Sequence, residues 1–546
     1  MRSLFSVADS IGSTNCAHRG TWHHRPARLW VTVAALVAGT IWLWFFFSVG
    51  LLGTYRAQDF VVNDLWKAAD SDGWRASSAP RTYWPSPPTE SDSNGYLRIQ
   101  LNGGLIQQHI AICNAVVVAR IMNATLVLPE LDTNSFWHDE RRSFLVAVYL
   151  LSSFLASMYG TSGFGDIYDV PHFIKTLKSD VRIVMSIPEI TAQGNIKKLR
   201  AYKMRPPRDA SVTWYKTTAL EKIREYGAIY LTPFSHRLAE EIDDPELQRL
   251  RCRVNYHALR FKPDIMKTSS DIVNKLRSEG HFMSVHLRFD LDMLAYAGCS
   301  DIFTPKDRII LMKYWKERFP IKGIDYRERR LIGKCPSTPE EVGLVLHAMG
   351  FDNSTRIYLA SGNPFGGKDF MEPFKAMFPR IENRNMIRME ESALGLAGSA
   401  VDYMVCLLSD IFIPTPDGPS SFANNVLGHR LYNGFQSTIT PNREALAPIF
   451  MDREEGKASG FEERVRQVML NTQFGAPHER IHPESFYTNS WPECFCQTKA
   501  RNHADQCPPD NVNYVLESQF QDKEDTEVEA KLTPPEKAKS WLVDLS

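Results

Sequence analysis

Residues 96–131 read YLRIQLNGGLIQQHIAICNAVVVARIMNATLVLPEL, and this stretch decides the fold class. Leu97, Ile99 and Leu101 alternate with polar residues, which indicates a strand with one buried face. A glycine pair follows, then a long apolar run typical of a buried helix, and then TLVLPEL, which predicts the next strand. This order of strand, helix and strand predicts an α/β protein with a parallel sheet.

The loop Asn102-Gly103-Gly104 lies between that strand and that helix. Backbone N–H groups at the start of a helix have no partner within the helix and attract anions such as phosphate. A glycine pair is equally compatible with a tight turn that binds nothing. The sequence therefore leaves two interpretations open for this loop, an anion site and a plain turn.

The N-terminal region predicts a membrane anchor. No charged residue occurs from Leu29 to Tyr55, which exceeds the roughly 20 apolar residues needed to cross a bilayer and is too long for a signal-peptide core. We expect a transmembrane helix over residues 29–53, with a buried core helix as the alternative. Basic residues dominate the tail, residues 1–28, so the positive-inside rule places that tail in the cytosol. The protein is thus predicted to be a single-pass type II membrane protein.

The composition fits a globular protein of the secretory pathway. Its 546 residues carry no net charge, which gives no support to nucleic-acid binding. Eight of the nine cysteines follow the predicted anchor, where disulfides can form. Cys494, Cys496 and Cys507 predict a local disulfide cluster, although their spacing does not fix the connectivity. Asn123 and Asn353 lie in N-glycosylation sequons.

Composition also divides the chain into segments. Residues 54–94 are rich in Pro, Ser and Asp and predict an extended stem. From there to about Cys507, strand-like runs alternate with helical patterns, as in α/β layering. Residues 508–546 are rich in charge and poor in aromatic residues, which predicts a disordered tail.

The stretch HFMSVHLRFDLDM predicts a second strand of interest. Its apolar residues alternate from Met283 to Leu287, which places His286 and Arg288 together on the other face, near the carboxyl end. Open α/β sheets bind ligands at that end, and a guanidinium can bind the oxygens of a diphosphate bidentately. The alternative is a surface arginine that pairs with a nearby acid, Asp290 or Asp292.

A third region, residues 399–435, combines an acid with hydroxyl groups. A helix that carries Asp402 leads to the strand DIFIP and a Pro/Gly loop, after which Ser420 and Ser421 open another helix. Hydroxyl caps and free N–H groups at a helix start form a second place suited to phosphate. For either serine alone, ordinary helix capping is the alternative.

Together these motifs resemble a known family. In chain order, GYLRIQLNGGLIQQ, NATLVLPELDTNSFWHD, YLTPFSHRLAEEI, RCRVNYHALRFKP, HLRFDLDMLAYAGC and SAVDYMVCLLSDIFIPTPDGPSSFANNVLGHR are similar to the plant protein-O-fucosyltransferase-like family. The resemblance is strongest to the branch implicated in wall polysaccharides and cell adhesion. It implies a GT-B glycosyltransferase with two Rossmann-like halves, residues 95–265 and 266–507, that face a donor-binding cleft. It also implies a Golgi enzyme that inverts the anomeric configuration and needs no metal.

Residue roles follow from the same resemblance. Arg288 matches an arginine that contacts the diphosphate and stabilises its departure, and His286 matches a histidine beside the donor; both are expected to be catalytic. Asp402 matches an acid that contacts the guanine base. The other expected donor-binding residues are Asn102, Gly103, Gly104, Ser420, Ser421 and Phe422. The expected donor is GDP-fucose or a related nucleotide sugar, with no cofactor and no metal site.

The sequence departs from the family pattern in two places. At Ile106 the family usually has a polar residue, often Asn, close to the reacting sugar, and isoleucine can neither donate nor accept a hydrogen bond. Either the acceptor supplies the missing group, or the enzyme is slow, or it is inactive. The second departure is an apolar insertion, residues 141–162, which is either foreign to the fold or a lineage-specific loop.

These expectations converge on one function and one rival. We expect transfer of fucose, or a related deoxyhexose such as rhamnose, from a nucleotide sugar to a glycan or glycoprotein. The rival is a non-catalytic Golgi protein that binds a nucleotide sugar and supports wall-polysaccharide assembly; Ile106 favours it, whereas Arg288 and the Ser-Ser-Phe segment oppose it.

Overall fold

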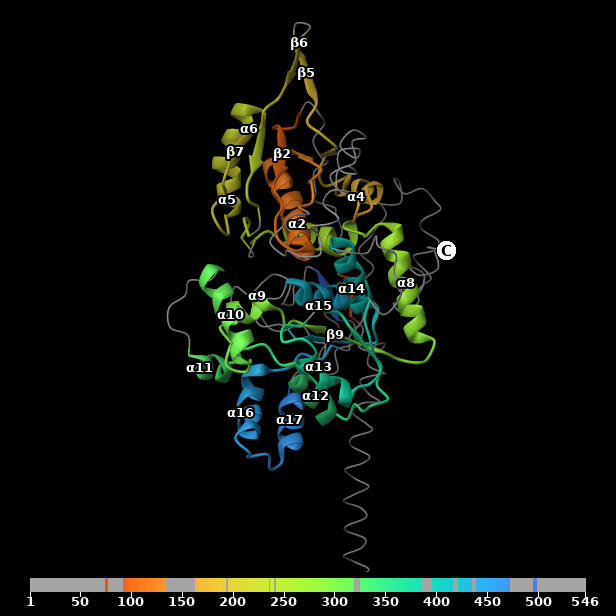
Figure 1. The fold of residues 1–546 in the computed structure, drawn as a ribbon. Helices are drawn as coiled ribbons and strands as arrows, with labels where there is room; N and C mark the ends of the chain where they lie inside the picture. Colours follow the sequence, from red (N-terminus) through yellow and green to blue (C-terminus); the bar gives the residue numbers. More distant parts are fainter. Residues whose placement is uncertain are drawn as a thin grey trace, which may run out of the picture. The chain divides into compact units, whose positions relative to one another are not determined.

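The computed structural model describes residues 74–76, 92–132, 163–471 and 494–497, with short internal gaps at 193–194, 235, 240–241, 319–324, 363, 385–394, 416–420 and 435–437. The predicted anchor (29–53), the insertion (141–162) and the predicted tail (508–546) lie outside the described residues, as do Ser420 and most of the predicted stem. Figure 1 shows the arrangement of the described elements.

The first sheet is parallel and five-stranded, in the order β4-β3-β2-β8-β7. Its strands are β2 (Tyr96–Ile99), β3 (Thr125–Val127), β4 (Ile183–Val184), β7 (Tyr202–Met204) and β8 (Ala228–Leu231). The predicted unit of strand, helix and strand is confirmed, because helix α2 (Leu105–Met122) connects β2 to its parallel neighbour β3.

Helix α2 is the element that is long and apolar enough to cross a membrane by length and composition, within the described part of the chain. Most of it is buried inside the protein, from Leu105 to Met122. It ends at Asn123, whose left-handed backbone (φ 51°) lets its N–H bond to carbonyls of the last turn. We therefore describe α2 as a core helix of the first sheet.

The second sheet is parallel and four-stranded, in the order β11-β10-β9-β12. Its strands are β9 (Met283–Leu287), β10 (Ile357–Leu359), β11 (Ile381–Glu382) and β12 (Ile411–Thr415). The prediction that β9 has one buried face was incomplete, because Ser284 and His286 are buried as well. The reason is its position between β10 and β12, since an inner parallel strand is covered on both faces. Two parallel sheets with helices confirm the α/β class.

Helices connect and cover these sheets. The helices between β3 and β9 in the chain are α4 (Val170–Leu177), α5 (Val212–Trp214), α6 (Leu220–Tyr226), α7 (Pro245–Arg253) and α8 (Pro263–Arg277), with two π-helical turns, η3 (Tyr215–Ala219) and η4 (Val254–Ala258). The helices that follow β9 in the chain are α9 (Leu291–Ala297), α10 (Pro305–Arg318), α11 (Tyr326–Leu331), α12 (Pro339–Ala348), α13 (Lys368–Met377), α14 (Leu396–Leu408), α15 (Ser421–Tyr432), α16 (Arg443–Glu454) and α17 (Phe461–Leu470). Two short antiparallel pairs complete the described fold: β5 (Glu189–Ala192) with β6 (Asn195–Lys198), and β1 (Trp74–Ala76) with β13 (Phe495–Gln497). The predicted boundary at residue 265 falls within α8.

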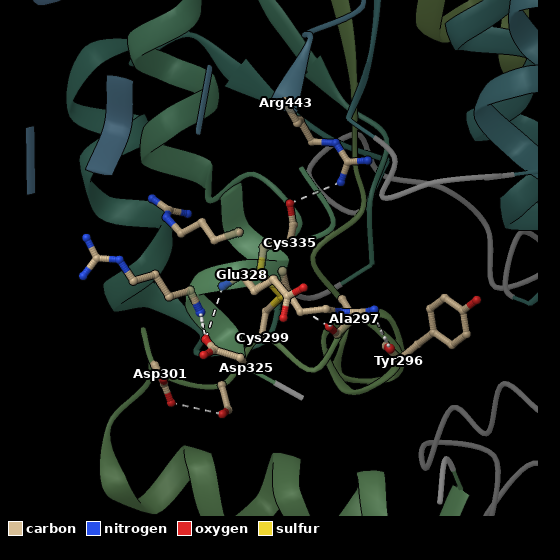
Figure 2. Close-up of a disulfide and its surroundings, with 12 residues drawn as sticks. Tyr296, Ala297, Cys299, Asp301, Asp325, Glu328, Cys335 and Arg443 are labelled. Carbon is tan, nitrogen blue, oxygen red and sulfur yellow. Dashed lines mark hydrogen bonds between the residues drawn. A yellow bond between two sulfur atoms is a disulfide. The ribbon is translucent and has the colours of Figure 1, made fainter. Parts of the chain in front are cut away.

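Among the residues that the structure describes, two disulfides join segments that are distant in sequence. Cys299 and Cys335 link the end of α9 to the segment after α11, and Figure 2 shows Arg443 donating to the carbonyl of Cys335 beside this bridge. Cys252 pairs with Cys494, 242 residues away. The predicted local cluster is therefore wrong for Cys494, because that residue packs beside Cys252 in a small core that no local spacing encodes.

Candidate active site

His286 lies near the carboxyl end of β9, as predicted, with a buried ring. Its Nδ1–H donates to the carbonyl of Ala360 over 2.9 Å. Its Nε2 is buried and accepts no hydrogen bond from the described residues. Burial, and then the charge of Arg288, lower the pKa of His286 to about 4. At neutral pH the ring is uncharged and keeps one free acceptor atom in a buried place.

Phe422 brings the start of α15 to this histidine. Its ring stacks on His286 with the centroids 4.4 Å apart and the planes 27° apart. It also meets the ring of Tyr403 edge-on, at 5.7 Å and 83°. Two motifs that are more than a hundred residues apart in sequence thus share one place, and Ser421, the first residue of α15, lies beside Phe422 in the chain.

Arg288 follows directly after β9 and is held by two acids. Its guanidinium donates to Asp290 over 2.9 Å and to Asp292 over 3.1 Å, and its backbone N–H donates to the Thr415 hydroxyl of β12. The alternative of a local ion pair is therefore realised, although the side chain is only 23% exposed rather than on the open surface. Burial raises the pKa of Asp292 to about 6 and that of Asp290 above its usual range, and Arg288 opposes both shifts. An anionic ligand of Arg288 has to share the guanidinium with these carboxylates or displace them.

Asp402 is buried on α14 and also has partners within the protein. It accepts a hydrogen bond from the Tyr358 hydroxyl over 2.8 Å and an ion pair from Arg384 over 2.5 Å. Burial raises the pKa of Asp402 to about 6, while Arg384 opposes the shift. The predicted order of a helix with this acid followed by a strand is confirmed by α14 and β12.

The glycine loop before α2 is closed by the helix's own side chains. The Gln107 side chain accepts from the backbone N–H of Gly104 over 3.1 Å, and Gln108 donates to the carbonyl of Gly103 over 2.8 Å. Gly103 has φ +90°, a backbone conformation that favours glycine, and a Cβ there would also displace the Gln107 side chain that caps the turn. One N–H at this helix start is therefore already capped; Asn102, which precedes the turn, is half-buried.

Ile106 is part of the core rather than of an open surface. It is 4% exposed and belongs to the apolar cluster around α2. A polar residue at this position would lose its contact with water. This environment explains why isoleucine is stable here, and it shows that the position does not face open solvent.

Both sequon asparagines are exposed at ends of elements. Asn123 caps α2 and its side chain donates to the carbonyl of Asp92 over 3.1 Å. Asn353 lies in a turn between α12 and β10. Within the residues that the structure describes, no group of three or more His, Cys, Asp or Glu side chains is placed to hold a metal.

A buried polar chain that sequence reasoning missed connects α2 to α15. His109 of α2 contacts the carbonyl of Asn255 over 2.9 Å, and the Asn255 amide donates to Asn425 of α15 over 2.6 Å. Because α2 follows the glycine loop and α15 begins beside Phe422, Asn255 ties together the two helices whose first turns the resemblance assigns to the donor. Only the presence of His and Asn in apolar runs hints at this chain.

Comparison with known proteins identifies the family. The sequence model described as GDP-fucose protein O-fucosyltransferase matches residues 96–433. "O-fucosyltransferase 1" of Arabidopsis thaliana is 60% identical over 500 residues, 91% of this chain and 92% of that protein. "Rhamnogalacturonan I rhamnosyltransferase 1" of the same plant is 34% identical over 81% of this chain and 86% of its own length.

A solved structure, that of POFUT1 in complex with GDP, is 14% identical and covers 64% of this chain and 98% of its own, with a TM-score of 0.34. Membership rests on the length of the family match and on the identity to the plant relatives, and it agrees with the resemblance seen in the motifs. The chain belongs to the GDP-fucose protein O-fucosyltransferase family and is similar to its plant O-fucosyltransferase members.

Proposed function

We propose that the protein transfers fucose, or a related deoxyhexose, from a nucleotide sugar to a hydroxyl group of a glycan or glycoprotein. The observation that carries the proposal is the meeting of His286, Arg288 and Phe422 at the carboxyl end of β9, where open α/β sheets bind ligands. In this proposal the fold is GT-B-like, and the second sheet with its helices holds the donor.

Three side chains of the site, those of Arg288, His286 and Asp402, have a role in the proposed reaction. Arg288 and the N–H groups at the start of α15 stabilise the negative charge that develops on the departing diphosphate, so no metal is required. The free Nε2 of His286 accepts a hydrogen bond from a donor hydroxyl. Asp402 accepts from the N–H groups of a purine base, in exchange for its ion pair with Arg384. The reaction inverts the anomeric centre by direct displacement.

The proposed location combines two sources: the N-terminal segment predicts a membrane anchor, and the family resemblance implies the Golgi. We place the protein in the Golgi membrane, with residues 29–53 as a single anchor and the described residues in the lumen. Protease added to sealed Golgi vesicles should spare an epitope inserted near residue 480. Digestion of that epitope in intact vesicles would exclude this topology.

The experiment that tests the proposal is a donor screen with the full-length protein. GDP- and UDP-linked sugars, with GDP-fucose and a nucleotide-linked rhamnose among them, are incubated with plant glycan acceptors, with and without a metal chelator. We expect sugar transfer from one deoxyhexose donor, unaffected by the chelator, with NMR showing inversion in the product. Absence of transfer and of donor hydrolysis across the panel would reject the proposal.

The rival function is binding of a nucleotide sugar without catalysis. It is favoured by Ile106, which is buried in the core where the family usually has a polar side chain. The same screen separates the two, because GDP binding in calorimetry without turnover of any donor would establish the rival.

A further inference from the structure

The first sheet has one face in the core and a second face that is exposed only in part. Leu97 of β2 and Ile229 of β8 lie in the core on the covered face. On the other face, Arg98 and Tyr230 are half-exposed and Lys203 is exposed. Thr125 of β3 and Ala228 of β8 lie on this same face and are buried, so its exposed part centres on these three positions of β2, β8 and β7.

Register places three of these side chains in one row. Arg98 of β2 is opposite Tyr230 of β8, and Tyr230 is opposite Lys203 of β7. Because partners in a parallel sheet point to the same side, Lys203, Tyr230 and Arg98 form a continuous strip across three strands. The Arg98 guanidinium lies 5.3 Å from the centre of the Tyr230 ring. The strip thus combines an aromatic ring with a cation on each side.

A hollow of about 210 Å³ adjoins this strip at the carboxyl ends of β2, β3 and β8. Its lining includes Arg98, Gln100, Glu130, Asp132 and Tyr230 and runs to Leu101, next to the glycine loop. The hollow is therefore polar, and it lies at the edge of the sheet where α/β proteins bind ligands.

The charge of Arg98 is available to a ligand. Its partner is Glu130 at 3.3 Å, with side-chain exposures of 40% and 73%. An exposed pair of this kind contributes little to stability, because water screens both charges. A ligand carboxylate can therefore replace Glu130 at little cost and bind the guanidinium bidentately.

The edge of the same sheet is basic. No acid occurs between Glu189 and Asp209, and the residues between them include Lys197, Lys198, Arg200, Lys203, Arg205 and Arg208. Strand β7 forms the edge of the sheet, and Arg200, Lys203 and Arg205 are exposed, without a carboxylate partner among the described residues. In a chain without net charge, this is a local positive surface next to the strip.

We propose that the strip of Lys203, Tyr230 and Arg98, with the adjoining hollow, binds a glycan that carries uronic-acid carboxylates. A guanidinium fork and an ammonium match carboxylates on successive sugars, and the flat apolar face of a pyranose packs on the tyrosine ring. The hollow holds the sugar unit next to the glycine loop. In the proposed function this glycan is the acceptor of the sugar; that role rests on the proposed function, whereas the binding itself does not.

The test uses the full-length protein and oligogalacturonate as the probe. Arg98→Ala should weaken binding about tenfold or more, since it removes a charge-assisted bidentate contact. Glu130→Gln should strengthen binding several-fold, because it removes the competing carboxylate. Arg327→Ala is the matched control, since Arg327 forms a comparable exposed pair with Glu455 at 3.2 Å on other elements, and it should leave affinity unchanged. Weaker binding by Glu130→Gln, or equal losses in Arg98→Ala and Arg327→Ala, would overturn the proposal.

Competing probes separate sugar recognition from general attraction to anions. Carboxyl-reduced oligogalacturonan and polyglutamate should each bind at least tenfold more weakly than oligogalacturonate. Tyr230→Phe should retain affinity, because the ring remains. Equal binding of polyglutamate, of single-stranded DNA or of anionic vesicles would overturn the assignment to a glycan. Arg288→Ala should reduce sugar transfer about 100-fold or more while oligogalacturonate affinity stays unchanged, so failure of the proposed function and failure of this inference give different results.

Discussion

The carboxyl ends of the two parallel sheets hold their charges in different ways. At the second sheet, Arg288 is 23% exposed and is clamped by two partly buried acids. At the first sheet, Arg98 is 40% exposed and has one exposed partner, Glu130. A buried charge needs a partner within the protein, because desolvation without one is costly, whereas an exposed pair contributes little. A ligand of Arg288 at the second sheet must therefore displace strongly held carboxylates. A ligand of Arg98 at the first sheet displaces only the weakly held Glu130.

The largest expected effect is on donor turnover, when the arginine at the carboxyl end of the second sheet is removed. Arg288→Ala should reduce turnover of the donor by about 100-fold or more, the scale of a lost transition-state donor. Turnover by Arg288→Lys should lie between that of wild type and that of Arg288→Ala, because lysine keeps the charge and loses the bidentate fork. The measurement is nucleotide release from GDP-fucose, with circular dichroism to confirm the fold and Arg327→Ala as the control. Turnover by Arg288→Ala at the wild-type rate would remove Arg288 from the mechanism.

The same comparison shows what the sequence could predict. The unit of β2, α2 and β3 was predictable because helical and strand periodicities are local. The closeness of His286 to Phe422 was predictable only through the family motifs. The strip of Lys203, Tyr230 and Arg98 was not predictable, since the register between distant strands has no local signal.

Other misses have the same origin. The pairing of Cys494 with Cys252 joins segments 242 residues apart, whereas cysteine spacing reports only nearby pairs. The pairing of Arg288 with Asp290 or Asp292 could be proposed from the sequence. The strength of that pairing depends on the burial of the three side chains, which makes it more than a surface ion pair. Periodicity cannot give that burial, because β9 is covered on both faces by elements distant in the chain.

A second test concerns the core next to the first glycine loop. Ile106→Asn places an amide where the side chain is 4% exposed, so unfolding free energy should fall by about 2 kcal/mol or more. Turnover per folded molecule should nevertheless rise if a polar group at this position assists the reaction. Ile106→Val is the control, with a loss of about 1 kcal/mol and no change in turnover. Urea unfolding and turnover are measured on the same samples; a loss of stability without a gain in turnover would show that isoleucine is not the limitation.

A third test uses pH to probe the buried acid of the second sheet. Burial raises the pKa of Asp402 to about 6, above its ordinary value of 3.8, so its protonated form stabilises the folded state. That contribution is complete below about pH 4 and is lost as pH rises through 6. Asp402→Asn cannot ionise at this position and does not lose this contribution. The melting temperature of Asp402→Asn minus that of wild type should therefore rise between pH 4 and 6.5 and stay constant above pH 6.5.

The quantity to measure is the difference in melting temperature between wild type and Asp402→Asn. Burial lowers the pKa of His109 and His286 to about 4, and neutral histidines add stability as pH rises over the same range. These contributions oppose that of Asp402 but are common to wild type and variant, so they cancel in the difference. A melting-temperature difference that is constant from pH 4 to 7 would show that Asp402 does not titrate in this range.

The smallest expected effect tests whether the first sheet depends on the insertion, residues 141–162. This segment lies outside the described residues, in the connection between β3 and α4. If it is foreign to the fold, its removal shortens a loop, which changes unfolding free energy by only about 0.5 kcal/mol. Removing an apolar run should also raise the yield of soluble protein, because exposed apolar surface promotes aggregation. Oligogalacturonate affinity reports on the first sheet and GDP affinity on the second, and both should match wild type. A deletion variant that fails to fold, or that loses oligogalacturonate binding alone, would show that the segment supports the first sheet and is a genuine part of the protein.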